Sequence, residues 1–322
     1  MSSKDSLLSR IRPQFTEGLD LAGGPTKPTP LPPTDFRCTQ PRYTLNNDVV
    51  LSASVRQQLD EALLKIEHYQ TIYVEWGFGA VDPAGKSLIL NFYGSPGTGK
   101  TLTAEAFAGS LGKKIMLVSI ADLESKFMGD TSKNIVQVFE AAKAEDAVLF
   151  FDEADTLLGK RLSSVTQGID NEVNAMRSTL LIELERHEGI VIFATNFAKN
   201  YDSAFVSRIS QHIKFDLPSE EERRFIWAKM LVSGIPLADN RDVILDSAAK
   251  VSESLSGRDI RTCMRLALPK ALLQQENALL STAHIQEAIN QVLAAVAELG
   301  STATSNSSNS KLDVARKLLG VN

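Results

Sequence analysis

The sequence predicts an α/β domain with a parallel sheet flanked by helices, followed by a smaller domain made only of helices. Between residues 88 and 215, short apolar runs alternate with helical stretches. Continuous apolar runs indicate strands buried on both faces, and their alternation with helices favours a parallel sheet with crossover helices. After Pro218 the strand pattern stops and further helical stretches follow.

The elements follow in order along the chain. An amphipathic helix is expected over 54–69, where apolar residues recur at helical spacing. The expected strands are Leu88–Tyr93, Lys114–Ser119, Ala147–Phe151, Ile190–Ala194 and His212–Phe215. We expect an extended arm over 1–48 because it is rich in Pro and Gly, a large domain over 49–217, a helical domain over 218–300, and a flexible tail with a short helix over 301–322.

Composition narrows the classes of function. The chain has 322 residues with 34 basic and 39 acidic side chains, a net charge of −5, and no basic run. Nucleic acid is therefore unlikely as a direct ligand. Two distant cysteines favour a reducing compartment. The start lacks a signal-peptide core, and no apolar run approaches the roughly 18 residues that span a bilayer. We expect a soluble, cytoplasmic protein.

The segment Gly94–Thr101 reads GSPGTGKT and lies between an expected strand and a helical stretch. This is the pattern of a phosphate-binding loop, in which glycines let backbone N–H groups surround phosphate oxygens. Lys100 can reach the β- and γ-phosphates, and the Thr101 hydroxyl can bind Mg²⁺. The strand–loop–helix context disfavours the alternative, a plain glycine-rich turn. We expect ATP and Mg²⁺ as ligands, with nucleotide contacts from Ser95, Pro96, Gly97, Thr98, Gly99, Lys100, Thr101 and Leu102.

A second segment, AVLFFDEAD at 147–155, is typical of the other half of such a site. Its apolar residues form a strand that ends at Asp152 and Glu153. We expect Asp152 to bind the metal and Glu153 to activate water as the catalytic base. The role of Asp155 stays open. Two adjacent acids alone are a weak signal, and the alternative is a solvated strand end.

Together these motifs resemble the AAA+ ATPases, specifically the AAA subgroup, from about Leu88 to Lys270. Ser95 stands where that subgroup usually has proline. The resemblance implies an α/β nucleotide domain with a helical lid, usually assembled as a homo-hexameric ring with nucleotide between subunits.

The resemblance also implies roles for three further residues. Asn196 in FATN stands at the first sensor position, where a polar group orients the attacking water. Arg208 in AFVSR matches the arginine finger, which reaches the nucleotide of the neighbouring subunit; the alternative is a surface ion pair. Arg258 in LSGRDIR matches a second sensor arginine that touches the nucleotide, and Arg261 is its rival.

The segment SKFMGDTSKNI, 125–135, lies where the family places its first pore loop. Phe127, Met128 and Gly129 fit the family pattern of aromatic, apolar and glycine. In a ring they would grip a polypeptide of almost any sequence, since apolar contact needs no particular partner. The alternative is an apolar helix end folded into the core. A second loop at 159–173 is a candidate to line the pore below the first loop. Its Lys160 and Arg161 are candidates for contact with the substrate or an adjacent subunit.

Narrower resemblances point to two biological roles. SGRDIR together with AFVSR is similar to the pachytene-checkpoint type of AAA+ ATPase, which remodels HORMA-domain proteins and has bacterial members in anti-phage signalling. WGFG and FFDEADTLLGKR also resemble bacterial AAA ATPases of less defined role, some of them linked to contractile injection systems. That resemblance favours a nucleotide-gated scaffold or assembly factor instead. A loader or helicase acting on DNA is disfavoured by the acidic composition.

Residues 73–85, which precede the first strand, include Trp76, Gly77 and Phe78. The family usually holds the adenine base before this strand, so these three residues are candidates for that pocket. Core packing is an equally strong alternative for Trp76 and Phe78.

Overall fold

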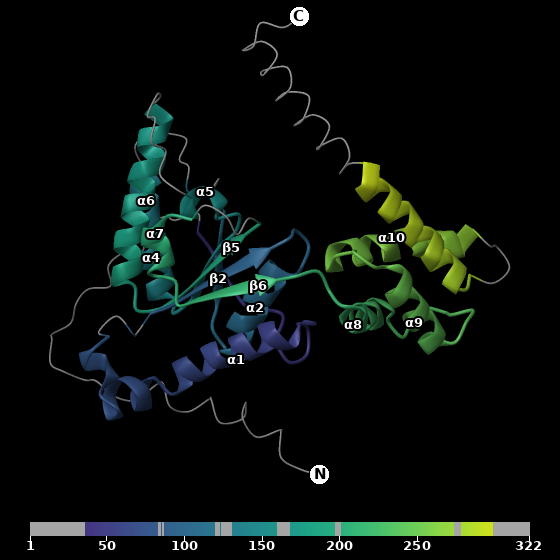
Figure 1. The fold of residues 1–322 in the computed structure, drawn as a ribbon, viewed down its shortest axis with the longest axis horizontal. Coiled ribbons are helices and arrows are strands. Elements are labelled where there is room, and N and C mark those ends of the chain that lie inside the picture. Colours follow the sequence, from purple (N-terminus) through teal and green to yellow (C-terminus); the bar gives the residue numbers. More distant parts are fainter. Residues whose placement is uncertain are drawn as a thin grey trace, which may run out of the picture. The chain divides into compact units, whose positions relative to one another are not determined.

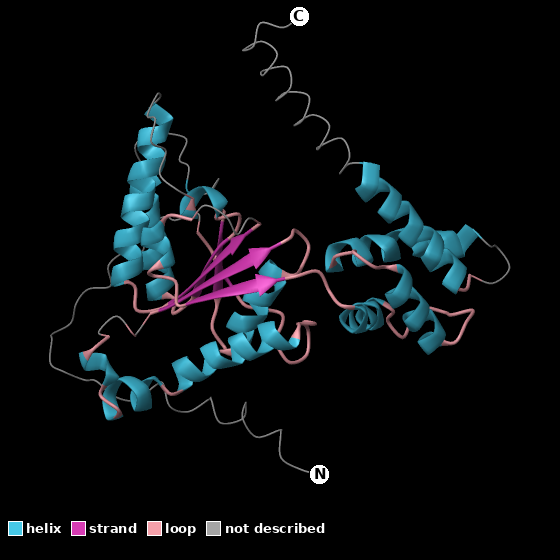
Figure 2. Ribbon diagram, viewed as in Figure 1, coloured by secondary structure: helices cyan, strands magenta, loops and turns pink. Residues whose placement is uncertain are grey.

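The computed structural model describes residues 36–82, 85, 87–119, 123, 131–159, 168–196, 201–273 and 278–298. These form two compact units (Figure 1), Met1–Ser95 with Gly99–Phe215, and Pro96–Thr98 with Asp216–Asn322. The first carries the sheet, and in the second every element of regular secondary structure among the described residues, an isolated bridge aside, is a helix (Figure 2).

The first unit is built on a six-stranded sheet with the order β1-β3-β4-β5-β2-β6. The strands are β1 (Cys38–Thr39), β2 (Leu88–Gly94), β3 (Ile115–Val118), β4 (Val148–Phe151), β5 (Ile190–Thr195) and β6 (Gln211–Phe215). The five from β2 to β6 pair in parallel, which confirms the predicted sheet. All five end at one edge, and that edge receives the residues that follow each strand.

β1 was not predicted. Cys38 pairs with Met116 and Thr39 with Ile115, antiparallel to β3 at the edge of the sheet. Residues 36–48, which the sequence analysis placed in an extended arm, therefore pack on the large unit. The carbonyl oxygen of Tyr43 lies 2.0 Å from the position a Cβ would take on Gly109, so a side chain there would clash with this segment.

Helices cover both faces of the sheet. They are α1 (Ala53–Glu67), α2 (Lys100–Ser110), α4 (Thr131–Ala144), α5 (Asp155–Leu158), α6 (Gly168–Arg186) and α7 (Ser203–Val206), with short η2 (Gln70–Glu75) and η3 (Phe78–Ala80). Alternate residues of the central strands divide the core. Leu90 and Phe92 pack with residues of α1 and α2, whereas Ile89 packs with residues of α4 and α6. Burial on both faces explains the continuous apolar runs.

The second unit packs α8 (Glu220–Met230), α9 (Arg241–Val251), α10 (Gly257–Leu273) and a helix over 282–298 around Trp227. Ser219 and Glu222 form a capping box that fixes the start of α8. The buried Arg223 guanidinium donates to the carbonyl of Ala249 at 2.9 Å, which ties α8 to α9. This is the all-helical pattern that the sequence predicted after Pro218.

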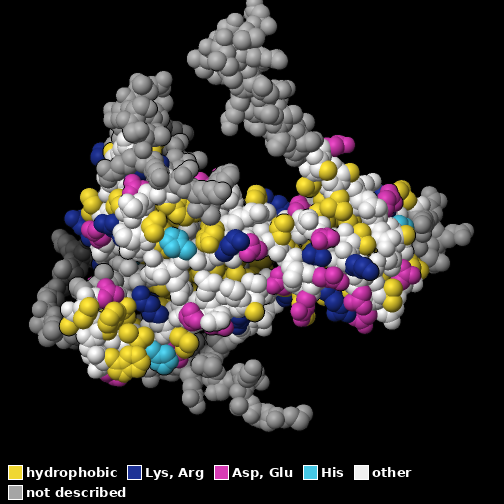
Figure 3. All heavy atoms as spheres, in the orientation of Figure 1, with side chains coloured by type: hydrophobic (Ala, Val, Ile, Leu, Met, Phe, Trp, Pro, Cys, Tyr) yellow, Lys and Arg dark blue, Asp and Glu magenta, His cyan; other side chains and the backbone are white. Residues whose placement is uncertain are grey.

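Surface charge is mixed over the visible face of the molecule, where basic and acidic side chains are interspersed (Figure 3). In the part of the chain that the structure describes, no helix has both the length and the hydropathy to cross a bilayer.

His187, just after α6, makes stability depend on pH. Its ring is buried and meets the Phe139 ring edge-on at 5.2 Å. Burial, followed by the nearby Lys143 charge, lowers the pKa of His187 from 6.5 to about 4. In the unfolded chain His187 takes up a proton below pH 6.5, whereas in the folded chain it stays neutral down to about pH 4.

We predict that stability falls as the pH drops through this window, by about 3 kcal/mol from His187 alone. His187→Leu should remove that part of the pH dependence. The measurement is urea unfolding of both proteins near neutral pH and near the folded pKa, comparing the change with pH rather than absolute stability. Equal changes in the two proteins would show that His187 is not the group responsible.

Candidate functional site

The phosphate-binding loop joins β2 to α2 and depends on glycine at three places. Gly94, Gly97 and Gly99 have φ values of 144°, 79° and 97°, in the region that L side chains rarely adopt. A Cβ on Gly94 would lie 2.0 Å from the carbonyl oxygen of Phe215. A Cβ on Gly99 would meet open space. The loop thus turns tightly at its start and leaves room before the first turn of α2.

The amino end of α2 opens toward this space. Gly99 is its N-cap residue, and among the described residues no side chain caps it. The first N–H groups of a helix have no partner within it and carry the positive end of the helix dipole. Backbone N–H groups at Gly99, Lys100 and Thr101 are therefore suited to a phosphate group.

Lys100 connects the loop to the neighbouring strand. Its side chain is buried, yet its ammonium group donates hydrogen bonds to the carbonyls of Gly94 at 2.7 Å and Ser95 at 3.0 Å, and to Asn196 Oδ1 at 3.0 Å. A buried cation is tolerated only when paired and hydrogen-bonded. The structure thus brings together two residues predicted for one site, Lys100 at the start of α2 and Asn196 just after β5.

The predicted metal pair also meets. The hydroxyl of Thr101 in α2 donates to Asp152 Oδ2 at 3.1 Å, and Asp152 Oδ1 accepts the backbone N–H of Glu153 at 2.9 Å. Mg²⁺ is usually held in nucleotide sites by one or two protein oxygens, with phosphate oxygens and water completing its shell. Thr101 and Asp152 supply such oxygens beside the phosphate-binding loop, so the residues fit a magnesium nucleotide.

Glu153 has a backbone conformation that is uncommon for its residue type. Its φ is 53°, in the left-handed region, and its side chain is exposed. Such strain costs on the order of 1–3 kcal/mol and persists where neighbours enforce it. The N–H groups of Asp152 and Ala154 on either side donate to the carbonyls of Val118 and Ala194 at 3.0 and 2.9 Å. These bonds fix the strand end while Glu153 projects from it.

Asp155 has a contact that clarifies its place. Its Oδ2 accepts the backbone N–H of Asn196 at 3.3 Å. Thr195, buried just before Asn196, forms a hydrogen bond with the Tyr201 hydroxyl at 2.5 Å. Asn196 is thus held on both sides, with its side chain bonded to Lys100. The sequence analysis left the role of Asp155 open, and it missed Tyr201 because that residue belongs to no distinctive spacing.

The tip of the loop, Pro96–Thr98, groups with the helical unit. Within that unit, the backbone N–H of Arg258 donates to the Gly97 carbonyl at 3.2 Å, and a Cβ on Gly97 would lie 2.4 Å from Ser256 Oγ. Arg258 stands in the first turn of α10, and Arg261 lies one turn further on. Both side chains are exposed. This contact is made by the backbone of Arg258, and the assignment of the second sensor to Arg258 stays a prediction.

Arg208 lies at the other end of the sheet. The N–H of Ser210 donates to the Ile89 carbonyl at 2.7 Å, and Ile89 is the second residue of β2. Gly94, where the phosphate-binding loop begins, is five residues further along, which is roughly 17 Å at the rise of a strand. Arg208 is therefore remote from the phosphate-binding loop of its own chain. It forms an ion pair with Glu185 of α6, as the alternative interpretation of this residue expected.

The interpretation of Trp76 and Phe78 changes. Their side chains are 76% and 46% exposed, so core packing is wrong for both. They lie with Gly77 on the η2 and η3 segment, which Figure 1 shows beyond the end of α1, at the amino end of β2. The phosphate-binding loop follows the opposite end of β2. The structure therefore does not bring these residues to the loop, and the adenine assignment has no support from it.

Other assignments lie outside the described residues. These are the candidate pore residues Phe127, Met128 and Gly129, and Lys160 and Arg161 in the second loop.

Comparisons with known proteins cover the part of the chain that carries these residues. Residues 90–217 match the model of the ATPase family associated with various cellular activities, AAA. The chain is 33% identical over 204 residues to a putative 26S proteasome regulatory subunit homolog of Methanothermobacter marburgensis, covering 62% of this chain and 54% of that protein. It is 33% identical over 230 residues to the AAA family ATPase y4kL of Sinorhizobium fredii, covering 70% and 66%.

The fold resembles the crystal structure of the FIGL-1 AAA domain in complex with ADP, with a TM-score of 0.64, 21% identity, and coverage of 80% and 86%. The chain spans about half the length of the first of these relatives. Residues 90–217 therefore form an AAA ATPase domain, with a parallel sheet flanked by helices and further helices after it.

The position of Glu153 generates a prediction. Glu153→Gln should bind ATP with a dissociation constant within about threefold of the unchanged protein, because Lys100, Thr101 and Asp152 remain. Its kcat should fall by at least about 100-fold, the lower range for loss of a general base. Steady-state ATPase assays and a fluorescent nucleotide titration measure the two. Glu145→Gln, three residues before the start of β4 and at the opposite end of that strand, is the control and should be unchanged. A normal kcat in Glu153→Gln would show that the base lies elsewhere.

Proposed function

We propose that this protein is an ATP-driven remodeller of other proteins that works as a ring of identical subunits, with a hexamer as the expected size. The observation that carries the proposal is the convergence of Lys100, Thr101, Asp152 and Asn196 at one edge of the sheet, with Glu153 beside them. These groups suffice to bind a magnesium nucleotide and to place a water against it.

The division of labour follows from the contacts. Lys100 and the backbone N–H groups of the loop neutralise phosphate charge, and Thr101 and Asp152 hold the metal. A bound Mg²⁺ would withdraw charge from the phosphate oxygens as the bond to the leaving group breaks. Glu153 accepts the proton of the attacking water, and the Asn196 amide, fixed by its bonds to Lys100 and Asp155, orients that water. By the resemblance of LSGRDIR, Arg258 would serve as the second sensor.

A ring is proposed because the arginine expected to stabilise the transition state cannot reach the phosphate-binding loop of its own chain. An arginine that stabilises charge in the transition state raises phosphoryl-transfer rates by about 10³–10⁵-fold. Arg208 matches that residue by resemblance, yet it stands near the start of β2, roughly 17 Å along the strand from its own loop. It would serve a nucleotide on a second copy. A contact that pairs different surfaces of identical chains closes into a ring when the rotation allows.

We propose from the sequence that ATP hydrolysis drives movement of a polypeptide through the ring. Phe127, Met128 and Gly129 would line the centre of the ring and pull on a polypeptide. One relative is named as a putative 26S proteasome regulatory subunit homolog, which supports a protein as the substrate. From SGRDIR and AFVSR we further propose that the partner is a HORMA-domain protein and that the biological setting is bacterial anti-phage signalling.

Phe127→Ala tests whether partner remodelling can be lost while ATP hydrolysis is kept. We expect ATP hydrolysis within about threefold of normal, because Phe127 is assigned no contact with nucleotide, and loss of partner remodelling, because the apolar grip is gone. The measurement is ATP-dependent hydrogen exchange of a HORMA-domain protein incubated with each variant. The control is Phe225→Ala, which removes an exposed aromatic side chain from α8. Remodelling that survives Phe127→Ala would refute threading.

The same assay distinguishes a remodeller from the alternative, a nucleotide-gated scaffold. A remodeller needs turnover, so Glu153→Gln should bind the partner in ATP without changing it. A scaffold that needs only bound ATP would remain active with Glu153→Gln. Capture of a contractile-particle protein in place of a HORMA-domain protein would favour that alternative.

A further inference from the structure

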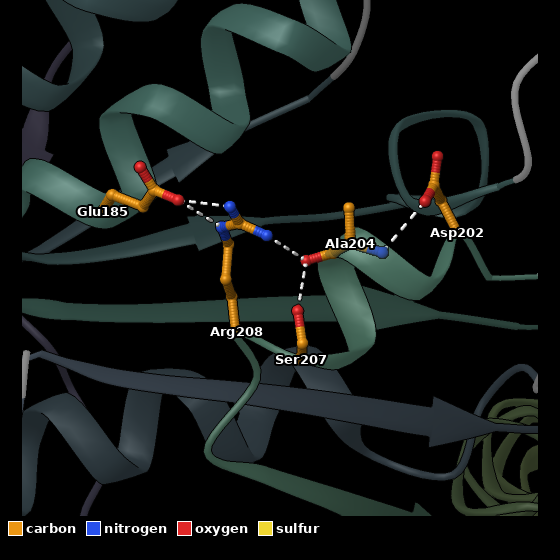
Figure 4. Close-up of polar contacts among 5 residues, drawn as sticks. All are labelled: Glu185, Asp202, Ala204, Ser207 and Arg208. Carbon is orange, nitrogen blue, oxygen red and sulfur yellow. Dashed lines mark hydrogen bonds and ion pairs between the residues drawn. The ribbon is translucent and has the colours of Figure 1, made fainter. Parts of the chain in front are cut away.

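The surroundings of Arg208 contain a feature that the proposed function does not use. The Arg208 guanidinium donates from Nε to Glu185 Oε1 at 3.1 Å and from Nη1 to the Ala204 carbonyl at 2.7 Å, and Nη2 also contacts Glu185 Oε1 (Figure 4). Nε and Nη2 lie on one edge of the planar group, so Glu185 holds that edge. Ala204 holds Nη1.

The turn beneath Arg208 is itself fixed. Asp202 caps α7 by accepting the N–H of Ala204 at 2.9 Å, and the Ser207 hydroxyl donates to the Ala204 carbonyl at 3.0 Å (Figure 4). The side chain of Phe205 is fully buried. The Ala204 carbonyl is therefore a rigid acceptor, and the backbone of Arg208 starts from a defined place.

Glu185 is badly placed to stabilise its own helix. It is the second-to-last residue of α6. A negative side chain in the last turn opposes the helix dipole, which favours cations there. Its side chain is 56% exposed, so burial does not explain it either. The contact that its charge makes among the described residues is with Arg208.

The pair leaves Arg208 able to bind an anion. A guanidinium has five N–H groups, and among the described residues three of them have partners. The side chain is 30% exposed. An incoming phosphate oxygen could accept from the remaining N–H groups while Glu185 stays bound. A contact that only sequestered the arginine would have to cover those groups as well.

We propose that Glu185 is a positioning residue for phosphoryl transfer. It holds one edge of the Arg208 guanidinium so that the opposite N–H groups face the nucleotide of a neighbouring copy. An arginine side chain has many rotamers, and one held in place beforehand loses less conformational freedom on reaching the transition state. This inference rests on the proposed function, because it needs Arg208 to act on a second copy.

The test is a double-mutant cycle on the assembled, full-length protein. Glu185→Ala should lower kcat about tenfold with the KM for ATP unchanged, because an interaction realised in the transition state is lost. Glu185→Gln keeps an acceptor without the charge and should fall between. Glu183→Ala is the control, since Glu183 lies on the same helix and its partner is Arg186. Assembly and the unfolding midpoint should not change.

The double-mutant cycle tests the positioning role of Glu185 separately from the proposed function. Arg208→Ala should cost orders of magnitude in kcat, and adding Glu185→Ala to it should cost nothing further. If Arg208→Ala has no effect, the proposed function fails. If Arg208→Ala is severe but Glu185→Ala leaves kcat unchanged, raises it, or adds fully to Arg208→Ala, the positioning role is wrong and the proposed function stands.

Discussion

The buried ammonium group of Lys100 is the contact on which the site depends. It bonds to two carbonyls of the loop after β2 and to the Asn196 amide after β5. β2 and β5 are neighbours and parallel, with Tyr93 opposite Thr195, so the residues that follow them leave the sheet side by side. One cation therefore fixes the spacing between the loop proposed to bind phosphate and the amide proposed to orient water. A buried charge without these oxygens would be costly, which couples the fold of the loop to the chemistry of the site.

The parallel sheet also separates two functions. Residues that follow the strands gather at one edge, where Thr101, Asp152 and Glu153 join Lys100. Arg208 precedes β6 and lies near the start of β2, at the opposite edge. A single chain thus carries a phosphate-binding edge and an arginine that cannot reach it. We therefore propose that the chain works in several copies, with the arginine of each copy directed at the nucleotide of the next. The bond between Tyr201 and Thr195 links the segment leading to Arg208 with the last residue of β5.

Much of this could be predicted from the sequence, and the rest depended on long-range geometry. The parallel strands followed from continuous apolar runs, and the loop followed from the spacing of glycines with Lys100 and Thr101. β1 was missed because two residues give no periodicity, and its partner Met116 is far along the chain. The positive φ of Glu153 arises from neighbouring strand ends, which no local pattern encodes. The exposure of Trp76 ran against the usual burial of large aromatics. Glu185 was missed because it is one acid among several on α6, and only the folded chain places it against Arg208.

The most direct measurement mixes two inactive proteins. Lys100→Ala should lose nucleotide binding but keep Arg208, and Arg208→Ala should bind nucleotide but lack the arginine. If the arginine of one copy serves the nucleotide of the next, mixing them should restore ATPase activity well above the sum of the two alone, rising and then falling as their ratio varies. Activity that never exceeds that sum, in mixtures shown to assemble together, would contradict the account.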